Sequence, residues 1–111
     1  MTAAEFRKMA LALDATEEQP HFDRVAFRIT GKRIFATLHE KDLSANLKLS
    51  PEDQSAFSTF GKGAVYAIPN KSGLQGWTTF ELKHLPKTLV KDALNTAYQL
   101  EAAWTKAKKK K

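Results

Sequence analysis

The side chains that could perform acid–base chemistry are few in this chain of 111 residues. Its three histidines, His21, His39 and His84, are far apart and lack the H-E-x-x-H spacing of a metalloprotease. His39 precedes Glu40 and Asp42, so an acid–base pair could form in space, although a histidine at a strand end is more often a polar terminus. The absence of cysteine excludes disulfides, thiolate metal sites and cysteine nucleophiles. We therefore expect no catalytic residues and no enzymatic activity.

The basic residues could instead bind an anionic partner, and their distribution matters more than their number. The formal net charge is +6, but five of the 18 basic residues are Lys106 and Lys108 to Lys111. Without these five lysines the chain has 13 basic residues against 12 acidic ones. A terminal block of like charges is usually disordered and solvated, and it binds polyanions weakly. We predict a single domain over residues 1–105 and a disordered lysine-rich tail over 106–111.

The composition indicates an ordinary soluble domain. Hydrophobic residues make up 42% of the chain and charged residues 27%, as in globular proteins. Glu5, Arg7 and Lys8 interrupt the N-terminal segment where a signal peptide needs an apolar run, and no apolar stretch reaches membrane-spanning length. We expect a cytoplasmic protein without a membrane partner.

In the first half of the chain, the hydrophobic pattern predicts two helices with three strands between them. Thr2 and Glu5 form a potential capping box ahead of an apolar stripe, which predicts a helix over residues 2–13. Alternating residues after the polar link 14–20 predict a hairpin over 24–30 and 34–38, and a further strand follows at 45–49. Ser50 and Pro51 are good starting residues for a helix that reaches residue 60.

The second half completes an α+β domain. Strands are predicted at 64–68 and 77–82, separated by a loop at 69–76, and a final helix at 86–104, whose apolar stripe is broken only by Glu101. The order α-β-β-β-α-β-β-α predicts an antiparallel five-stranded sheet with helices on one face and the other face open to solvent. The expected core residues are Phe6, Met9, Leu13, Val25, Phe27, Ile29, Leu47, Leu49, Phe57, Phe80, Leu94 and Ala97.

Four segments carry a family resemblance. "QPHFDRVAFRITGKRIFATL", "LKLSPEDQSAF", "NKSGLQGWTTFEL" and "LNTAYQLEAAW" resemble, in order and spacing, the landmarks of the MmcQ/YjbR-like proteins. The resemblance implies a sandwich similar to CyaY and frataxin, and a double-wing DNA-binding surface. Asp23 departs from the pattern, because members often have glycine there, and it brings a negative charge near any basic surface.

The likeness to frataxin raises the question of iron. Frataxin-like iron binding resembles a hard-cation site made of many carboxylates on the first helix and the adjoining strand. Here Glu5 and Asp14 are offset by two basic residues on that helix, and the acidic residues of the link 14–23 are more simply a solvated loop. We expect no metal site and no cofactor.

The candidate binding residues lie on the open face of the sheet and in the loops beside it. Cations that pair with phosphates and an aromatic ring that stacks on a base are typical of nucleic-acid surfaces. Outward arginines and lysines are equally typical of any solvated sheet face, and Trp77 could instead cover apolar surface under the loop 69–75. The candidates are Arg24, Arg28, Lys32, Arg33, Lys48, Lys71 and Trp77.

The sequence thus leaves three interpretations of function open, of which the last is an enzyme whose catalytic residues are brought together only by the fold. The first is a non-enzymatic, monomeric DNA-binding protein that uses this basic and aromatic face. The second is a protein-interaction or small-ligand module that uses the same face. Trp77 follows Gly76, which permits close backbone approach, so we expect its ring to be partly buried at the edge of the open face.

Overall fold

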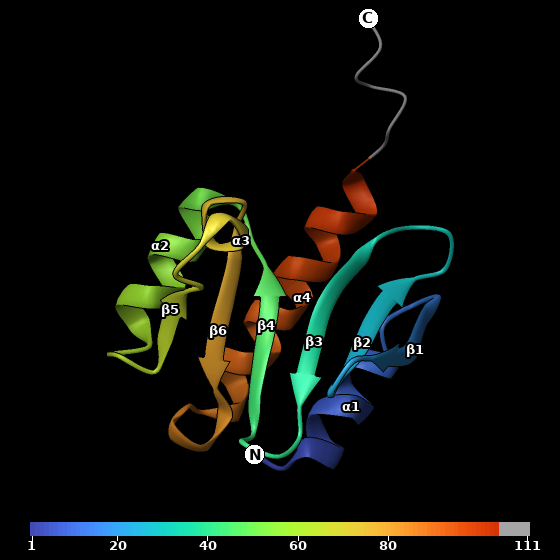
Figure 1. Cartoon of the computed structure of the whole chain (residues 1–111), viewed down its shortest axis with the longest axis horizontal. Helices are drawn as coiled ribbons and strands as arrows, with labels where there is room; N and C mark the ends of the chain where they lie inside the picture. Colours follow the sequence, from blue (N-terminus) through green and yellow to red (C-terminus); the bar gives the residue numbers. More distant parts are fainter. Residues whose placement is uncertain (105–111) are drawn as a thin grey trace, which may run out of the picture.

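The computed structural model describes residues 1–104, which form one sheet with helices packed against it (Figure 1). The lysine-rich segment 106–111, predicted to be a tail, lies outside the described residues. The helices are α1 (Ala3–Leu11), α2 (Pro51–Phe60), α3 (Lys71–Leu74) and α4 (Lys87–Ala103), with a 3-10 turn at Leu82–His84. None of these helices is long and apolar enough to cross a membrane.

The sheet is antiparallel throughout and has six strands in the order β1-β2-β3-β4-β6-β5. Their bounds are β1 (Thr16–His21), β2 (Arg24–Ile29), β3 (Ile34–His39), β4 (Ser44–Lys48), β5 (Val65–Ala67) and β6 (Trp77–Glu81). The prediction of five strands is wrong, because β1 lies in the segment expected to be a polar link. Its sequence TEEQPH has no apolar alternation, and Pro20 is tolerated because β1 is an edge strand.

The ends of the first two helices follow from local sequence. The Thr2 hydroxyl accepts from the Glu5 backbone N–H at 3.1 Å, and the Glu5 carboxylate accepts from the Thr2 N–H at 2.8 Å, which completes the predicted capping box. Ser50 caps α2 by accepting from the Asp53 N–H at 3.1 Å. Both caps satisfy backbone donors that would otherwise lack partners.

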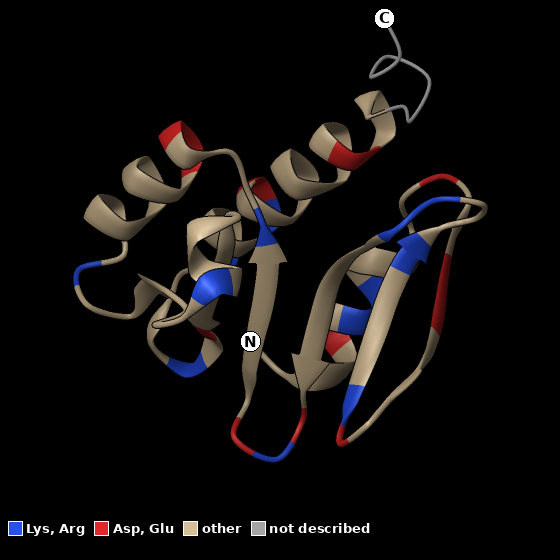
Figure 2. Cartoon of the chain, turned by 45° about the horizontal axis from the view of Figure 1, so that its top comes forward, with Lys and Arg blue, Asp and Glu red and all other residues tan. Residues whose placement is uncertain are grey.

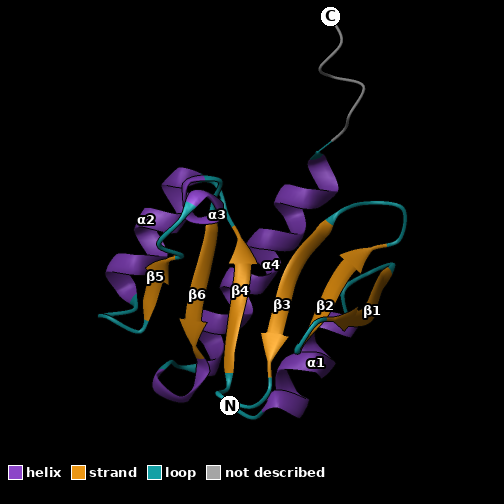
Figure 3. Cartoon of the chain, viewed as in Figure 1, coloured by secondary structure: helices purple, strands orange, loops and turns teal. Residues whose placement is uncertain are grey.

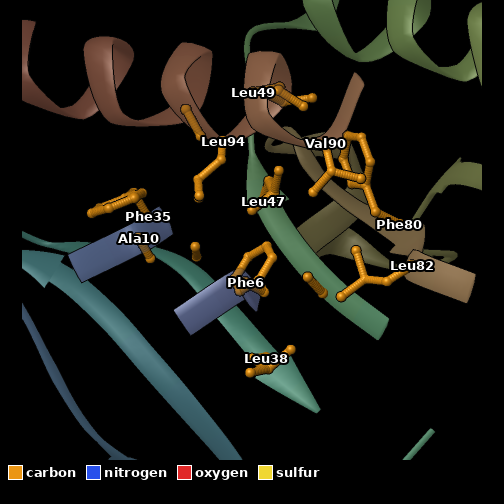
Figure 4. Close-up of a cluster of buried hydrophobic side chains, with 14 of the residues drawn as sticks. Phe6, Ala10, Phe35, Leu38, Leu47, Leu49, Phe80, Leu82, Val90 and Leu94 are labelled. Carbon is orange, nitrogen blue, oxygen red and sulfur yellow. The ribbon is translucent and has the colours of Figure 1, made fainter. Parts of the chain in front are cut away.

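The hydrophobic core lies between the sheet and the helices α1, α2 and α4 (Figures 3 and 4). Nine of the twelve predicted core residues are buried, and Met9, Leu13 and Val25 are partly buried against the core. Phe35 was not predicted, and it is fully buried because the β2–β3 register shifts after Phe27 and turns an extra β3 residue inward. The core therefore occupies one face of the sheet.

The opposite side of the sheet is called here the outer face. Strand alternation turns every second residue away from the core, and of the helices in residues 1–104 only the four-residue α3, at the start of β6, lies on this side (Figure 1). The outward residues of the five strands β2 to β6 are Arg24, Ala26, Arg28, Ile34, Thr37, His39, Ser44, Asn46, Lys48, Tyr66, Trp77, Thr79 and Glu81. Arg24, Arg28, Lys48 and Trp77 point outward, as predicted.

A buried ion pair joins α4 to the turn between β2 and β3. The Glu101 side chain is only 3% exposed, and its carboxylate accepts from Arg33 Nη2 at 2.9 Å, Arg33 Nε at 3.1 Å and the Arg33 backbone N–H at 3.1 Å. The Arg33 guanidinium lies 3.5 Å from the centre of the Trp104 ring, and Lys32 Nζ donates to the Trp104 carbonyl at 2.9 Å. Glu101 therefore interrupts the apolar stripe in order to hold this turn.

We predict that Glu101→Gln lowers the free energy of unfolding by about 2–4 kcal/mol. The substitution keeps the size of the side chain but removes the charge that accepts three N–H donors, and the partial exposure of Arg33 keeps the loss below that of a fully buried pair. Urea denaturation measures the change. Glu40→Gln is the matched control, because Glu40 lies 3.8 Å from Arg7 in an exposed pair and should contribute below about 1 kcal/mol. Equal losses in the two variants would contradict the prediction.

Candidate functional site

The structure divides the predicted basic residues into two groups. The residues of the first group already contact other residues of this protein. Arg28 Nε lies 2.7 Å from Glu17 Oε2 on β1 in a solvent-exposed pair. Lys32 and Arg33 contact Trp104 and Glu101 as described above. The structure therefore gives Lys32 and Arg33 a role in holding the β2–β3 turn, and a partner would have to compete with Glu17 for Arg28.

Arg24, Lys48 and Lys71 form the second group, which lies on β2, β4 and α3 (basic segments in blue in Figure 2). Lys48 and Lys71 are near Trp77, whereas Arg24 precedes Val25, the register partner of Leu38, and so lies at the His39 end of the sheet. Lys48 is the register partner of Trp77 in the β4–β6 ladder, and burial together with the nearby Arg33 charge lowers the pKa of the Lys48 ammonium. Lys71 is the exposed first residue of α3, a few residues before Trp77. Among the described residues, none of these three cations lies within ion-pair distance of a carboxylate. Their charges remain available to a ligand.

Trp77 is partly buried on the outer face, as predicted. Gly76 makes its position possible, because the Gly76 backbone has a φ of +106° and a Cβ atom there would lie 1.9 Å from the Leu49 carbonyl oxygen. The Leu49 N–H donates to the Gly76 carbonyl at 2.9 Å, so the chain enters β6 in direct contact with the end of β4. Only glycine permits this approach, which places the indole beside Lys48.

Trp77 and Arg24 share a hollow in the outer face, called here the outer-face hollow. It has a volume of about 450 Å³, and Thr37 and Asn46 from the central strands also line it. Thr37 and Asn46 are register partners on β3 and β4, so they form neighbouring parts of its floor. The sheet register thus places the first residues of β2 and β6, Arg24 and Trp77, on one concave surface although they are far apart in sequence.

A polar cluster around His39 lies at the other end of these strands. His39 Nε2 is 3.0 Å from Asp23 Oδ2 and Nδ1 is 2.8 Å from Asp42 Oδ1, although the second contact departs from hydrogen-bond geometry. The Asp42 carboxylate also accepts from the Ser44 hydroxyl at 2.7 Å, and this bond, with the His39 contact, lowers the pKa of Asp42. The predicted pairing of His39 with Asp42 occurs, whereas Glu40 instead faces Arg7. Asp23 was missed as a partner, because only the β1–β2 turn brings it to β3.

The surroundings of His39 favour its protonated form. Contact with Asp42 raises its pKa most, burial opposes this, and Asp23 raises it further. Both ring nitrogens lie close to a carboxylate oxygen, and a negative charge beside each of them stabilises the protonated ring. Among residues 1–104, no group of three or more histidine, aspartate or glutamate side chains has an arrangement that could hold a metal ion.

We predict that His39 stabilises the fold in a pH-dependent manner. Because its pKa is raised in the folded state, the contribution is fully present below the unfolded pKa of about 6.5 and is lost as the pH rises through the folded pKa. The stability difference between the wild type and His39→Gln should therefore shrink from pH 6 to pH 9 in urea denaturation. His84→Gln is the control, because His84 is exposed and forms no ion pair among the described residues. A difference independent of pH would show that His39 is not charged in its native contacts.

Comparisons with known proteins agree with this architecture. The fold is similar to the crystal structure of Deinococcus radiodurans protein DR2400, which has a DUF419 domain, with a TM-score of 0.80 at 21% identity over 98% of this chain and 86% of that chain. A Pseudomonas syringae protein of known structure is similar with a TM-score of 0.67 at 18% identity, over 91% of this chain and 99% of that chain. These likenesses show the fold alone, and none of the curated proteins matches the chain. The YjbR family model matches residues 11–100, so the chain belongs to the YjbR family.

Proposed function

We propose that this protein is a non-enzymatic DNA-binding protein that holds single-stranded DNA on its outer face. The observation that carries the proposal is the position of Trp77, partly exposed on a concave sheet surface and next to Lys48. An exposed indole offers a stacking surface to any base, and stacking contributes about 1–3 kcal/mol per base in such proteins.

The unpaired cations of the outer face and of α3 support the same partner. Arg24, Lys48 and Lys71 come from β2, β4 and α3, with Lys48 and Lys71 at the Trp77 end of the sheet and Arg24 at the other end of the hollow that it shares with Trp77. Cations spaced in this way can follow the phosphates of a strand whose base lies on the ring. Lysines and arginines that bind phosphate release counterions, which makes the affinity depend on salt.

The shape of the surface favours a single strand over a duplex. The outer-face hollow is about 450 Å³, which accommodates a small group but not the width of a double helix. Bases within a duplex are stacked on each other and cannot stack on Trp77 without being extruded, which costs free energy. Unpaired bases avoid that cost.

A protein partner on the same face is the second candidate, and exposed apolar side chains favour it. Phe22 is 94% exposed in the β1–β2 turn, and Leu74 is 86% exposed on α3. Aromatic and aliphatic anchors of this kind are typical of protein interfaces. Binding of a protein to this face, without binding of DNA, would support this candidate.

We further propose a frataxin-like and CyaY-like sandwich, a cytoplasmic location and a monomeric state. A sheet covered by α1 and α4 supports the likeness to the frataxin and CyaY sandwich, and superposition on a frataxin structure tests it. The absence of cysteine supports a cytoplasmic location, which fractionation of the native cells tests. Light scattering of the purified protein tests the proposal that it is a monomer.

We predict that Trp77→Ala weakens binding of a short oligothymidine by about 1–3 kcal/mol in a fluorescence anisotropy titration, because the stacking surface is lost. Since Trp77 is only partly buried, the free energy of unfolding should fall by less than the 3–5 kcal/mol typical of a buried aromatic. Phe60→Ala is the matched control, because Phe60 is 68% exposed on α2, which packs against the opposite face. A large loss of stability with unchanged affinity would remove Trp77 from the binding surface.

The lysine-rich segment needs a separate arm of this experiment, because it could bind DNA by charge alone. We predict that the full-length chain with glutamine at Lys106 and Lys108 to Lys111 retains binding that is sensitive to Trp77→Ala. The slope of log affinity against log salt should fall by about 0.7 for each phosphate contact that the tail supplies on a single strand. Complete loss of binding in this variant would place the DNA affinity in the tail and contradict the outer-face proposal.

A further inference from the structure

Arg24 differs from the other arginines of this protein. Of the four, Arg7, Arg28 and Arg33 each form an ion pair with a glutamate, whereas Arg24 has no carboxylate within ion-pair distance among residues 1–104. Its Nη1 atom is buried and has no hydrogen-bond partner there. A guanidinium with a buried, unpartnered N–H is costly, and an anion would remove that cost.

Thr37 is a second, independent observation that points to a ligand site in this hollow. It is 7% exposed, lines the outer-face hollow, and has a buried Oγ1 atom without a hydrogen-bond partner among the described residues. Buried hydroxyls in folded proteins nearly always have a partner, and valine would fill the same volume without that cost. Two unpartnered polar side chains, Arg24 and Thr37, thus line one hollow.

Asn46 adds a directed donor to the floor of the hollow. Its side-chain oxygen accepts from the Thr79 hydroxyl at 2.8 Å, which leaves the side-chain NH2 group for the hollow. A hydroxyl and an amide side by side can recognise the polar edge of a heterocyclic base, because such edges alternate donors and acceptors.

The walls of the hollow include aromatic and aliphatic side chains, together with the polar side chains of His21, Asp23 and Ser72, and the Asp23 carboxylate lies 3.0 Å from His39. Trp77 and Ile68 line one side, and Phe22 lines the other, in the turn between β1 and β2. Phe22 has a φ of +60°, a conformation that is unfavourable for a bulky residue, and its side chain is 94% exposed. A strained, solvated aromatic at the rim of a polar-floored hollow suits a flat ligand that enters between the walls.

We propose that the outer-face hollow is a site for one nucleotide unit, a flat base attached to a phosphate. The base lies between the apolar side chains of the walls with its polar edge toward Thr37 and Asn46, and the Arg24 guanidinium binds the phosphate. The unit comes either from a free nucleotide or from a strand on the outer face, and in the second case the inference rests on the function proposed above. A volume of about 450 Å³ lies within the range of small-molecule sites.

The test uses the full-length protein and two probes, thymidine monophosphate and a short oligothymidine, with calorimetric titration. Thymidine without phosphate and an oligonucleotide of abasic residues are the matching probes that lack one half of the unit. We expect Arg24→Gln to weaken the binding of thymidine monophosphate and of the oligothymidine roughly 10–100-fold, which is the effect of losing a charged hydrogen bond. Thr37→Val should weaken them about 3–10-fold.

Two controls separate a ligand contact from a structural role. Arg28→Gln changes an outward arginine of the same strand that already pairs with Glu17, so it should leave nucleotide affinity within about twofold of the wild type. Thr37→Val should leave the melting temperature unchanged or raise it, because the hydroxyl has no partner to lose. Loss of affinity without loss of stability is a result that a purely structural threonine would not give.

The outcomes distinguish this inference from the proposed function. If the oligonucleotide binds through Trp77 but Arg24→Gln and Thr37→Val leave both probes unaffected, the nucleotide site is overturned and the DNA-binding proposal stands. If thymidine monophosphate binds and is weakened by both variants while the strand does not bind, the site stands and the DNA-binding proposal fails. If neither probe binds at millimolar concentration, the nucleotide site and the DNA-binding proposal are both contradicted.

Discussion

The coverage of only one face of the sheet is the constraint from which the other features follow. Helices α1, α2 and α4 pack against the inward residues of the central strands, so the alternate residues of those strands have no protein layer above them. An antiparallel sheet tolerates this, because its solvent face can be polar. The outer face therefore has the composition that solvent or a ligand allows, and a threonine and an asparagine occupy its centre.

The same constraint explains why the sequence could identify the outward cations but could not rank them. Arg24 and Arg28 have the same residue type, strand and direction, and only the pairing of β1 with β2 gives Arg28 a glutamate partner. Arg33 likewise depends on Glu101, 68 positions away in the sequence. Contacts over such distances leave no local signal, so the candidate site could be predicted as a surface but not as a hollow around Arg24.

The fold itself was largely predictable, because most of its elements satisfy local rules. Capping at Thr2 and Ser50 and the alternation of β2, β4 and β6 placed those elements within a few residues. The two missed elements, β1 and α3, follow no such rule: β1 is a polar edge strand whose partners come from the ladder, and α3 is four residues long and contains glycine. Each is held by tertiary contacts, and each borders the outer-face hollow.

The distribution of unfavourable features also carries information about function. The core is built from apolar side chains, whereas the Thr37 hydroxyl, the Arg24 guanidinium and the positive-φ residue Phe22 border one hollow. Unpartnered atoms also occur at Thr16 and His39, and positive φ angles at Ala15, Leu43 and Lys62, outside that hollow. A single unpartnered atom or positive φ therefore does not indicate a ligand, but a buried guanidinium nitrogen and a buried hydroxyl that line the same hollow do. Thr37 in particular could be replaced by valine without altering the sheet. Two buried polar groups without partners on one concave surface, where a single ligand could bind both, are the pattern expected of a binding site.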